Sequence, residues 1–401
     1  MNRSASTRCA ILSAVVPALL AVTGCGSDDS SDAGTRTIPG LAGGVTCSAP
    51  DGAKGPGAGT KAVGFVLSGS KSDRGYNQAV HAGARALGDA CKDLKIIESA
   101  PVASGADMIS AAERMIDDGA KVIFSTNPNL RAAAVALAKK HPDVAVLLQN
   151  AVVEPPLPPN LGTYAGSSYE TFYLAGVVAA TATKSKKLGF VAGSPDPPTL
   201  LDVNAFELGA QSIASKAQTH VAFIGGRCDS VKQAAAARRL LEQGADVLAQ
   251  QQDCTATVIK AAEARDKYSI GLHFDARALA PKGWLTGVES NWAPLFGAIV
   301  SSIQKGKFAR SDFHDNLVVG FSSTQIPPAT RLGRYGPAID VNTARRVSDA
   351  RAEILGGRSP FRGPVVDQAG NVRIARGKSA TRKQLAAMSY LVRGVVGSIQ
   401  K

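Results

Sequence analysis

Polar side chains that donate and accept hydrogen bonds gather directly after the strand-like runs of this 401-residue chain. Asn, Gln, Ser and Asp supply donors and acceptors without a strong nucleophile, as reversible binding of a neutral polar ligand requires. We therefore predict a binding site for a small polar molecule at these segments. They lie at Ser68–Asn77, Ser125–Asn129, Gln149–Asn150, Ser194–Asp202, Gly225–Asp229, Gln250–Thr255 and His273–Arg277.

The motifs of catalysis are absent or incomplete. The chain has no Gly-x-Ser-x-Gly and no His-Glu-x-x-His sequence. The run Gly377-Lys378-Ser379 resembles the end of a phosphate-binding loop, but Val372 occupies the position of that loop's first glycine. Isolated carboxylates such as Asp253 and Asp275 could act as a base, although carboxylates in a binding cleft more often accept hydrogen bonds. We expect no catalytic residue, no cofactor and no enzyme.

Short apolar runs alternate with amphipathic helical stretches from Lys61 onward. This alternation is typical of parallel sheets with helices on both faces. The predicted strands are Ala62–Leu67, Lys121–Ser125, Val144–Gln149, Lys187–Gly193, His220–Gly225, Asp246–Gln250 and Ser269–His273. The predicted helices are Asn77–Lys92, Pro128–Lys140, Leu201–Ser215, Ser230–Gln243 and Thr255–Arg265.

An internal repeat spaces these elements by 125 residues. Lys61–Val66 (KAVGFV) returns as Lys186–Val191 (KKLGFV), and Ala111–Val122 returns as Ala236–Val247. At the same offset Asn150 corresponds to Asp275. A register kept over so long a stretch indicates two copies of one α/β unit. We predict a two-lobed α/β clamshell similar to type I periplasmic binding proteins, with the ligand between the carboxyl ends of the strands.

The expected domains follow from the repeat. Lobe I is predicted at residues 61–165 plus about 288–325, and lobe II at 166–287 plus about 326–360, with a basic tail at 361–401 packed on the lobes. Most of the formal charge of +13 lies near the end of the chain, because residues 331–401 hold 14 Lys and Arg against 4 Asp and Glu, a net of +10. This region has no zinc-finger spacing and no glycine–aromatic RNA-binding signature. We expect a solvated or membrane-facing surface and no nucleic-acid partner.

The first 25 residues resemble the signal sequence of a bacterial lipoprotein. An apolar run, Cys9–Ala21, follows two arginines and is too short to span a bilayer. Val22-Thr23-Gly24-Cys25 comes next and is similar to the lipobox, at which signal peptidase cuts and the cysteine is acylated. We expect a signal peptide at residues 1–24, lipid on Cys25 and a flexible tether at 25–60. An ordinary secretory signal is the alternative.

The remaining cysteines can form disulfides outside the cytoplasm. Cys47, Cys91, Cys228 and Cys254 allow three pairings. Cys47–Cys91 with Cys228–Cys254 is the pairing that keeps each bridge within one lobe. A metal site is the other interpretation, but no Cys-x-x-Cys occurs and the five histidines are scattered singly, so we expect no metal.

Several motifs follow one another in order along the chain. The turn Asp73–Asn77 comes first, and further runs extend from Lys61 to the C-terminus, namely Tyr164–Tyr169, Tyr173–Gly176, Thr183–Val191, Asn204–Ala210, Gly244–Asp253, Asn291-Trp292 and Met388–Ile399. Together they resemble the basic membrane protein (PnrA-like) family of lipoproteins, which bind purine nucleosides or bases for ABC importers, and Asp73–Asn77 is similar to the turn after that family's first strand. The resemblance implies a solute receptor that lies outside the cytoplasm, is anchored to the membrane, docks to an ABC permease and binds a purine base or nucleoside.

The resemblance also implies which side chains bind the ligand. Tyr76 would stack on the base and Trp292 would form a wall of the cleft. Asn150 stands where nucleoside-binding members have an Asp that faces the base, and Asp275 matches the carboxylate that meets their ribose hydroxyls. The full expected set is Tyr76, Asn77, Asn127, Asn150, Tyr169, Arg227, Gln251, Asp253, Asp275 and Trp292.

Second interpretations stay open for several positions. Tyr76 could only cover the first strand, Asn77 could only fix its turn, Asp275 could cap a helix, and Trp292 could pack at a hinge.

Two departures from the family pattern bear on the ligand. Ser290 replaces a lysine near the sugar, and Cys228 replaces the second stacking aromatic. Its neighbour Arg227 could lie on a base or attract an anionic ligand. A sensor lipoprotein that signals to a receptor, or an importer receptor for a sugar-like or anionic ligand, are the alternative functions.

Overall fold

The computed structural model describes Cys47, Pro50 and residues 52–151, 153, 156–308, 317–324 and 327–399. The predicted signal peptide, the lipidation site at Cys25 and most of the predicted tether lie outside these residues. Within them, no helix combines the length and the apolar character that a membrane crossing needs.

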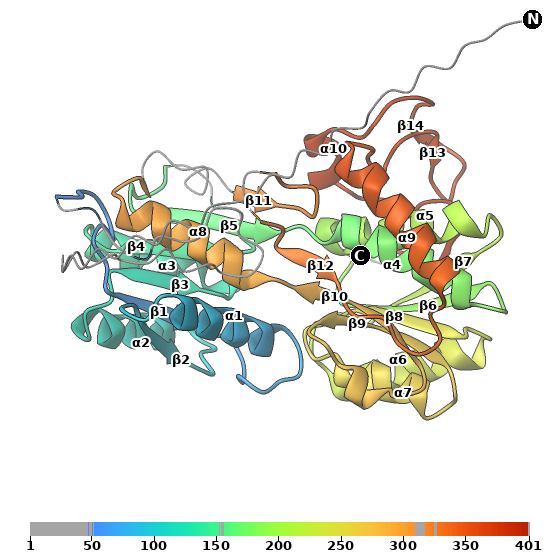
Figure 1. Cartoon of the computed structure of the whole chain (residues 1–401), viewed down its shortest axis with the longest axis horizontal. Helices are drawn as coiled ribbons and strands as arrows, with labels where there is room; N and C mark the ends of the chain where they lie inside the picture. Colours follow the sequence, from blue (N-terminus) through green and yellow to red (C-terminus); the bar gives the residue numbers. More distant parts are fainter. Residues whose placement is uncertain are drawn as a thin grey trace, which may run out of the picture. The chain divides into compact units, whose positions relative to one another are not determined.

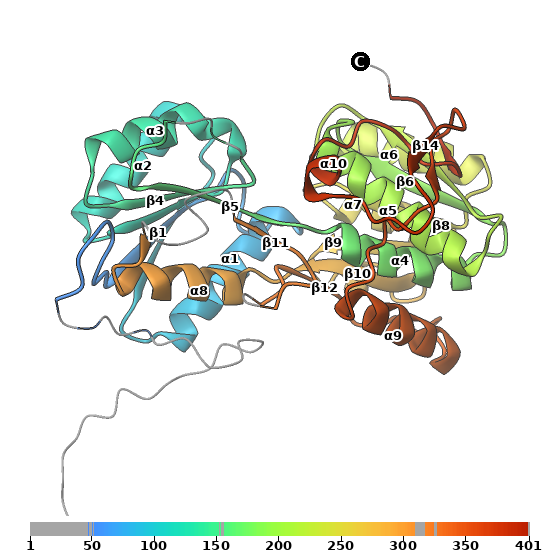
Figure 2. The same ribbon diagram turned by 90° about the horizontal axis from the view of Figure 1, so that it is seen from above.

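The first sheet has six strands among the described residues, and all neighbouring strands are parallel. Its central strands are buried along their whole length, as expected when helices cover both faces. Helices α1 (Tyr76–Ala90) and α8 (Trp292–Gln304) pack on one face, and α2 (Gly105–Asp117) and α3 (Arg131–Lys140) on the other (Figure 2). The strand order is β11 (Leu317–Val319), β5 (Leu161–Gly166), β4 (Ala145–Gln149), β3 (Val122–Ser125), β1 (Ala62–Val66) and β2 (Lys95–Ser99). We call this sheet with its four helices the first half.

The second sheet has the same construction, with one antiparallel strand at its edge. Helices α4 (Tyr169–Ala182) and α5 (Pro197–Ile213) cover one face, and α6 (Ser230–Glu242) and α7 (Ala256–Glu263) cover the other (Figure 1). The order is β12 (Thr330–Leu332), β10 (Trp284–Ser290), β9 (Tyr268–His273), β8 (Val247–Gln251), β6 (Lys187–Ala192), β7 (Gln218–Phe223) and β15 (Val395–Val396), with β12 antiparallel to β10. We call this sheet with its helices the second half. The predicted α/β fold with two helix-flanked parallel sheets is confirmed.

The repeat in sequence corresponds to a repeat in structure. The order β2-β1-β3-β4-β5 in the first sheet matches β7-β6-β8-β9-β10 in the second. Gly119 and Gly244 end α2 and α6 with positive φ angles of 93° and 94°, a backbone conformation that favours glycine. The next residues repeat the cap as well, since Ala120 N–H donates to Met115 and Ala245 N–H donates to Leu240. The repeated helix-to-strand motif is therefore a helix C-cap that turns the chain into the next strand.

The C-terminal segment completes the second half. Helix α9 (Val341–Leu355) packs beside α4, and the hairpin of β13 (Val365–Val366) and β14 (Val372–Ile374) leads to α10 (Arg382–Ala386). Strand β15 then pairs with β7 at the edge of the second sheet. Phe361, Leu391 and Val395 are buried in the second half's core. The described part of the basic tail is thus a structural layer of the second half, whereas the exact lobe boundaries stay a prediction.

Both predicted disulfides are present. Cys47–Cys91 ties the chain ahead of β1 to the residue that follows α1. Cys228–Cys254 joins the loop after β7 to the loop after β8. The first bridge therefore stabilises the first half, and the second lies at the carboxyl ends of the second sheet's strands.

Candidate functional site

The turn after β1 is held by one carboxylate. Asp73 accepts hydrogen bonds from the backbone N–H groups of Gly75, Asn77 and Gln78, at 2.9 to 3.0 Å. The side-chain NH₂ of Asn77 also donates to Asp73, and its oxygen accepts the backbone N–H of Gly69 at 3.0 Å. Asp73 thus satisfies N–H groups at the start of α1 that have no partner within the helix. Asn77 braces this loop with both of its polar atoms.

Tyr76 is placed by this turn and is almost fully buried, with 7% of its surface exposed. Its hydroxyl donates to the backbone carbonyl of Thr126 at 3.0 Å. Burial raises the pKa of Tyr76 well above its ordinary value, and the nearby carboxylate of Asp253 raises it further, whereas Arg227 and Asn150 lower it. Asn150 therefore hydrogen-bonds to this tyrosine, and the charges of Asp253 and Arg227 act on it.

Trp292 borders Tyr76 from the start of α8. The two rings meet edge to face with 6.4 Å between their centroids, and Trp292 stacks on Phe296 at 6.0 Å. Its indole N–H is buried and has no hydrogen-bond partner among the described residues. Trp292 therefore supports Tyr76 from the first half's core.

Two amides of the first half follow strand ends. Asn127 is half-buried, and its side-chain oxygen accepts the N–H of Asn129 at the start of a short 3₁₀ helix (Pro128–Leu130). Asn150 is exposed at the end of β4 and has a positive φ of 55°, an uncommon conformation for a residue other than glycine. Such conformations often occur at functional sites. Of the two, Asn150 is the one whose side chain reaches Tyr76.

The second half contributes a charged group of residues to the same place. The guanidinium of Arg227 donates to Gln251 at 3.1 Å and pairs with Asp196 at 3.0 Å. The backbone N–H of Asp253 donates to the carbonyl of Arg227 at 2.6 Å, which fixes one loop on the other. The side chain of Asp253 is 30% exposed, and the Nε2 atom of His273 lies 3.7 Å from its carboxylate. Arg227 is therefore neutralised locally, whereas Asp253 keeps an available carboxylate.

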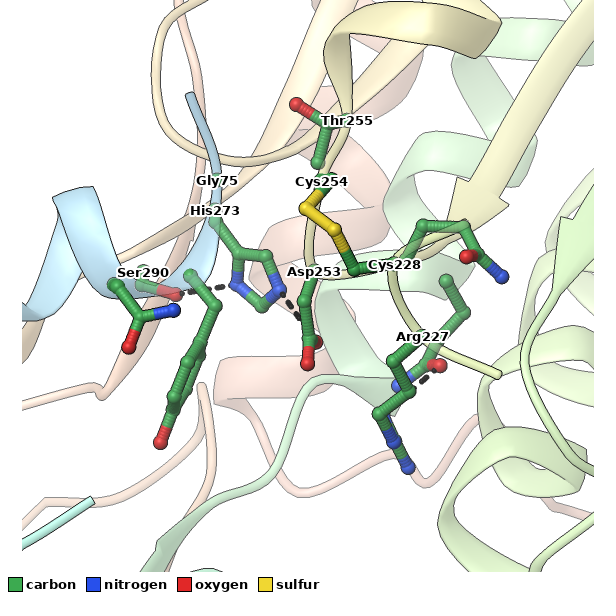
Figure 3. A network of polar contacts seen from close by, with 12 residues as sticks. Gly75, Arg227, Cys228, Asp253, Cys254, Thr255, His273 and Ser290 are labelled. Carbon is green, nitrogen blue, oxygen red and sulfur yellow. Dashed lines mark hydrogen bonds and ion pairs between the residues drawn. A yellow bond between two sulfur atoms is a disulfide. The ribbon is translucent and has the colours of Figure 1, made fainter. Parts of the chain in front are cut away.

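His273 lies at the centre of the site, although the sequence did not single it out as a ligand-binding residue. It is the last residue of β9 and has a positive φ of 71°. Its Nδ1 lies 3.1 Å from the Ser290 hydroxyl and its Nε2 lies 3.7 Å from the Asp253 carboxylate, as Figure 3 shows. The imidazole also meets the Tyr76 ring edge to face, with centroids 5.4 Å apart. His273 therefore connects the aromatic residues of the first half with the carboxylate of the second.

A buried carboxyl, Asp202, lies on α5, close enough to Arg227 for the guanidinium charge to act on it. The sequence predicted a loop through Asp202, which is wrong, because Asp196 caps the helix and Pro197 opens it four residues earlier than expected. Burial raises the pKa of Asp202 to about 8, although the Ser168 hydroxyl at 2.9 Å and the charge of Arg227 lower it. Asp202 is therefore largely protonated at neutral pH.

Two predicted site residues have other neighbours. Asp275 accepts three hydrogen bonds from Arg277, and these bonds lower its pKa. The ring of Tyr169 packs against Phe361 of the C-terminal segment, with 5.9 Å between centroids, and its hydroxyl lies 3.5 Å from the Glu170 carboxylate. Burial raises the pKa of Tyr169. These contacts are with Arg277, Phe361 and Glu170, and not with Tyr76 or Asp253.

Over the described part of the chain, no group of three or more His, Cys, Asp or Glu side chains is arranged to hold a metal ion. The arrangement of Tyr76, His273, Asp253 and Asn150 instead offers an aromatic ring with hydrogen-bond donors and acceptors around it. Such a set suits reversible binding of a flat polar molecule.

Comparison with known proteins decides the family. The family model of the PnrA-like ABC transporter substrate-binding proteins matches residues 60–318. The chain belongs to this family. A purine-binding protein of Brucella abortus is 30% identical over 337 residues, which cover 83% of this chain and 92% of that protein. A putative ABC transporter glucose-binding protein of Haloferax volcanii is 26% identical, over 71% of this chain and 69% of that protein.

A solved structure agrees in fold with this PnrA-like chain. The ABC transporter solute-binding protein from Conexibacter woesei superposes with a TM-score of 0.61 at 20% identity, over 74% of this chain and 96% of that one. At this identity the similarity concerns the fold alone. The family predicted from the motifs is therefore confirmed by sequence, and the two-sheet architecture by structure.

The PnrA-like chain has its own contacts at the two positions where it departs from the family pattern. Ser290 lies against His273. Cys228 is bridged to Cys254, beside Asp253, so it supports a loop at the position where the resemblance implied a second stacking ring.

Proposed function

We propose that this protein is the lipid-anchored solute receptor of an ABC importer, which binds a purine base or nucleoside between its two halves outside the cytoplasm. On this proposal it docks to a membrane permease and catalyses no reaction. One observation carries the proposal: the ring of Tyr76, from the first half, lies against His273 beside the partly exposed carboxylate of Asp253, from the second. A tyrosine ring can stack on a base for about 1–3 kcal/mol, and a carboxylate accepts base N–H or ribose O–H groups.

The charges of the site favour a neutral ligand. Arg227 is paired with Asp196 and hydrogen-bonded to Gln251, so it has no free charge for a phosphate. The carboxylate of Asp253, which is partly exposed and has only the imidazole of His273 at 3.7 Å beside it, would repel an anion nearby. A base or nucleoside therefore fits better than a nucleotide, and an anionic ligand at Arg227 is disfavoured. The purine-binding relative supports the same class of ligand.

If residues of both halves contact the same ligand molecule, the ligand also favours the state in which the halves are in contact. Contacts from Tyr76 and Asp253 to one molecule exist together only in that state, so the ligand stabilises it by its differential affinity.

Native mass spectrometry and thermal-shift titration of the mature chain test the proposal. The ligands are adenine, adenosine, adenosine monophosphate and glucose, the last because one relative is named as glucose-binding. We expect a one-to-one adduct and a saturable rise in melting temperature with adenine or adenosine, worth about 2.7 kcal/mol at a hundredfold excess over Kd. No shift with any purine would contradict the proposal. Release of adenine from adenosine would contradict the absence of catalysis.

A further inference from the structure

The two halves touch through their backbones at Gly75, beside the ligand site. The backbone N–H of Tyr76 donates to the carbonyl of Asp253 at 2.9 Å, and Gly75 pairs with Cys254 in an isolated antiparallel bridge. The Thr255 hydroxyl donates to the carbonyl of Arg74 at 2.8 Å. Figure 3 shows Gly75 close to Cys254 and Thr255. We call this contact the latch. All its donors and acceptors are protein atoms.

Only glycine permits the latch at position 75. A Cβ built on Gly75 would overlap the carbonyl oxygen of Asp253 and approach Cys254. Since both obstacles are backbone atoms, no side-chain rotation would relieve the overlap. An alanine would therefore push the halves apart at this point.

The second-half side of the latch is held by contacts within its own half. Its backbone carbonyls at Cys254 and Thr255 accept hydrogen bonds from the fully buried amides of Gln233 and Gln250, at 3.0 and 3.1 Å. The disulfide from Cys254 to Cys228 ties the same loop to the neighbouring one.

The first-half side of the latch is equally fixed, by the Asp73 carboxylate that holds the turn. Two pre-ordered loops lose little conformational freedom when they meet, so more of their interaction energy remains to hold the halves together.

We propose that Gly75 and the Cys228–Cys254 disulfide are positioning residues for ligand binding. They do not contact the ligand, but they set the rate at which it dissociates. The latch must break for the halves to separate at this point, so it adds to the barrier for ligand release. This inference rests on the proposed function, because it assigns the latch to the site of that ligand.

Gly75→Ala tests the latch against Gly105→Ala, a matched control in the same half. A Cβ at Gly105 meets only the Ala133 methyl group at 3.4 Å, an ordinary contact. Stopped-flow measurement with adenine should show dissociation at least tenfold faster for Gly75→Ala and unchanged for Gly105→Ala, with association within about threefold of wild type. Equal dissociation rates for Gly75→Ala and wild type would overturn the proposal.

The two disulfides form a second matched pair. Cys228→Ser/Cys254→Ser should speed adenine dissociation, whereas Cys47→Ser/Cys91→Ser should lower the melting temperature and leave dissociation unchanged. The same change in both double variants would contradict a positioning role. Thr255→Val is a milder variant that should fold normally, since it removes one latch hydrogen bond and keeps the shape of the side chain. It should speed adenine dissociation about threefold to fivefold.

Failure of the latch and failure of the proposed function are distinguishable. If wild type binds neither adenine nor adenosine, the proposed function fails, and small-angle scattering of the ligand-free protein still tests the latch. Gly75→Ala should then have a larger radius of gyration than wild type and Gly105→Ala. An identical radius in all three proteins would overturn the latch as well.

Discussion

The two halves share a strand order and a 125-residue repeat, yet they bring different chemistry to the ends of their strands. The first half provides a ring and neutral amides, at Tyr76, Asn127 and Asn150. The second provides an imidazole and a carboxylate, at His273 and Asp253. The repeated positions are those of strands and helix caps, such as Gly119 and Gly244, which have the same backbone conformation in both halves. The fold is therefore duplicated, and the site depends on residues that differ between the copies.

The halves also differ in the direction in which the pKa values of certain carboxyl groups are shifted, upward for two buried carboxyls of the second half and downward for a partly exposed one of the first. Asp202 and Glu207, both on α5 of the second half, have pKa values raised by burial to about 8 and about 7. In the first half, Glu113 has a lowered pKa, because Lys140 donates a hydrogen bond to it. We expect the second half to respond to pH more strongly than the first.

The largest expected effect is that of Tyr76→Ala. It removes the aromatic ring from the site and leaves a cavity beside Trp292, so affinity for adenine should fall at least tenfold and stability by about 3–5 kcal/mol. Titration calorimetry and denaturant unfolding measure the two losses. Tyr76→Phe keeps the ring and loses only the hydrogen bonds of the hydroxyl, to Thr126 and Asn150, so it should retain most of the affinity. Unchanged affinity in Tyr76→Ala would remove this residue from the site.

A smaller effect is expected from pH. Because the folded pKa of Asp202 is raised above 3.8, the folded protein binds more protons than the unfolded chain between about pH 4 and pH 8. The contribution of Asp202 to the free energy of unfolding is therefore fully present below about pH 4. It is lost as pH rises to about 8, at up to about 1.4 kcal/mol per pH unit.

Unfolding free energies at pH 6 and pH 8 measure the slope. Asp202→Asn should lose less stability than wild type over this interval, because the amide does not ionise. Glu113→Gln in the first half should match wild type, because a carboxyl with a lowered pKa is ionised at both values. Parallel slopes for Asp202→Asn and wild type would show that this carboxyl does not carry the difference between the halves.

The smallest effect is expected at Asp275. Arg277 holds this carboxylate with three hydrogen bonds, so Asp275→Ala should change adenine affinity by less than about twofold. Affinity for adenosine, measured by the same calorimetry, gives the sharper comparison. A loss of affinity confined to adenosine would assign Asp275 to the ribose. The second half would then contribute a second carboxylate to the site beside Asp253.

The sequence predicts the buried strands that are continuous apolar runs, because such a run is a strong signal. Strands β1, β3, β4, β6, β8 and β9 agree with the predicted strands to within one or two residues. Strands β5 (LGTYAG) and β10 (WLTGVES) are also largely buried but were not predicted, since Gly, Thr and polar residues interrupt their apolar residues. Strand β2 was not predicted either, since its sequence KIIES is only partly buried at an edge. Helix α4 was also missed, because it is buried almost all round and lacks an amphipathic pattern.

The candidate site was predictable as a set of loops, but not in its contacts. Tyr76, Asn150 and Asp253 follow strands, so the repeat points to them. The importance of His273 depends on Ser290 and Asp253, which pairing of β8, β9 and β10 brings beside it. The latch partners, Gly75 and Cys254, are 179 residues apart and lie in loops of different halves, so no local pattern connects them.

Competition dialysis with labelled adenine tests the central claim most directly. The mature protein is equilibrated with adenine, and unlabelled adenosine, adenosine monophosphate or glucose is then added. The account predicts saturable binding of one adenine per chain, displaced by excess adenosine but not by the monophosphate or by glucose. Absence of adenine binding, or displacement by glucose alone, would contradict a purine receptor built from the ring of one half and the carboxylate of the other.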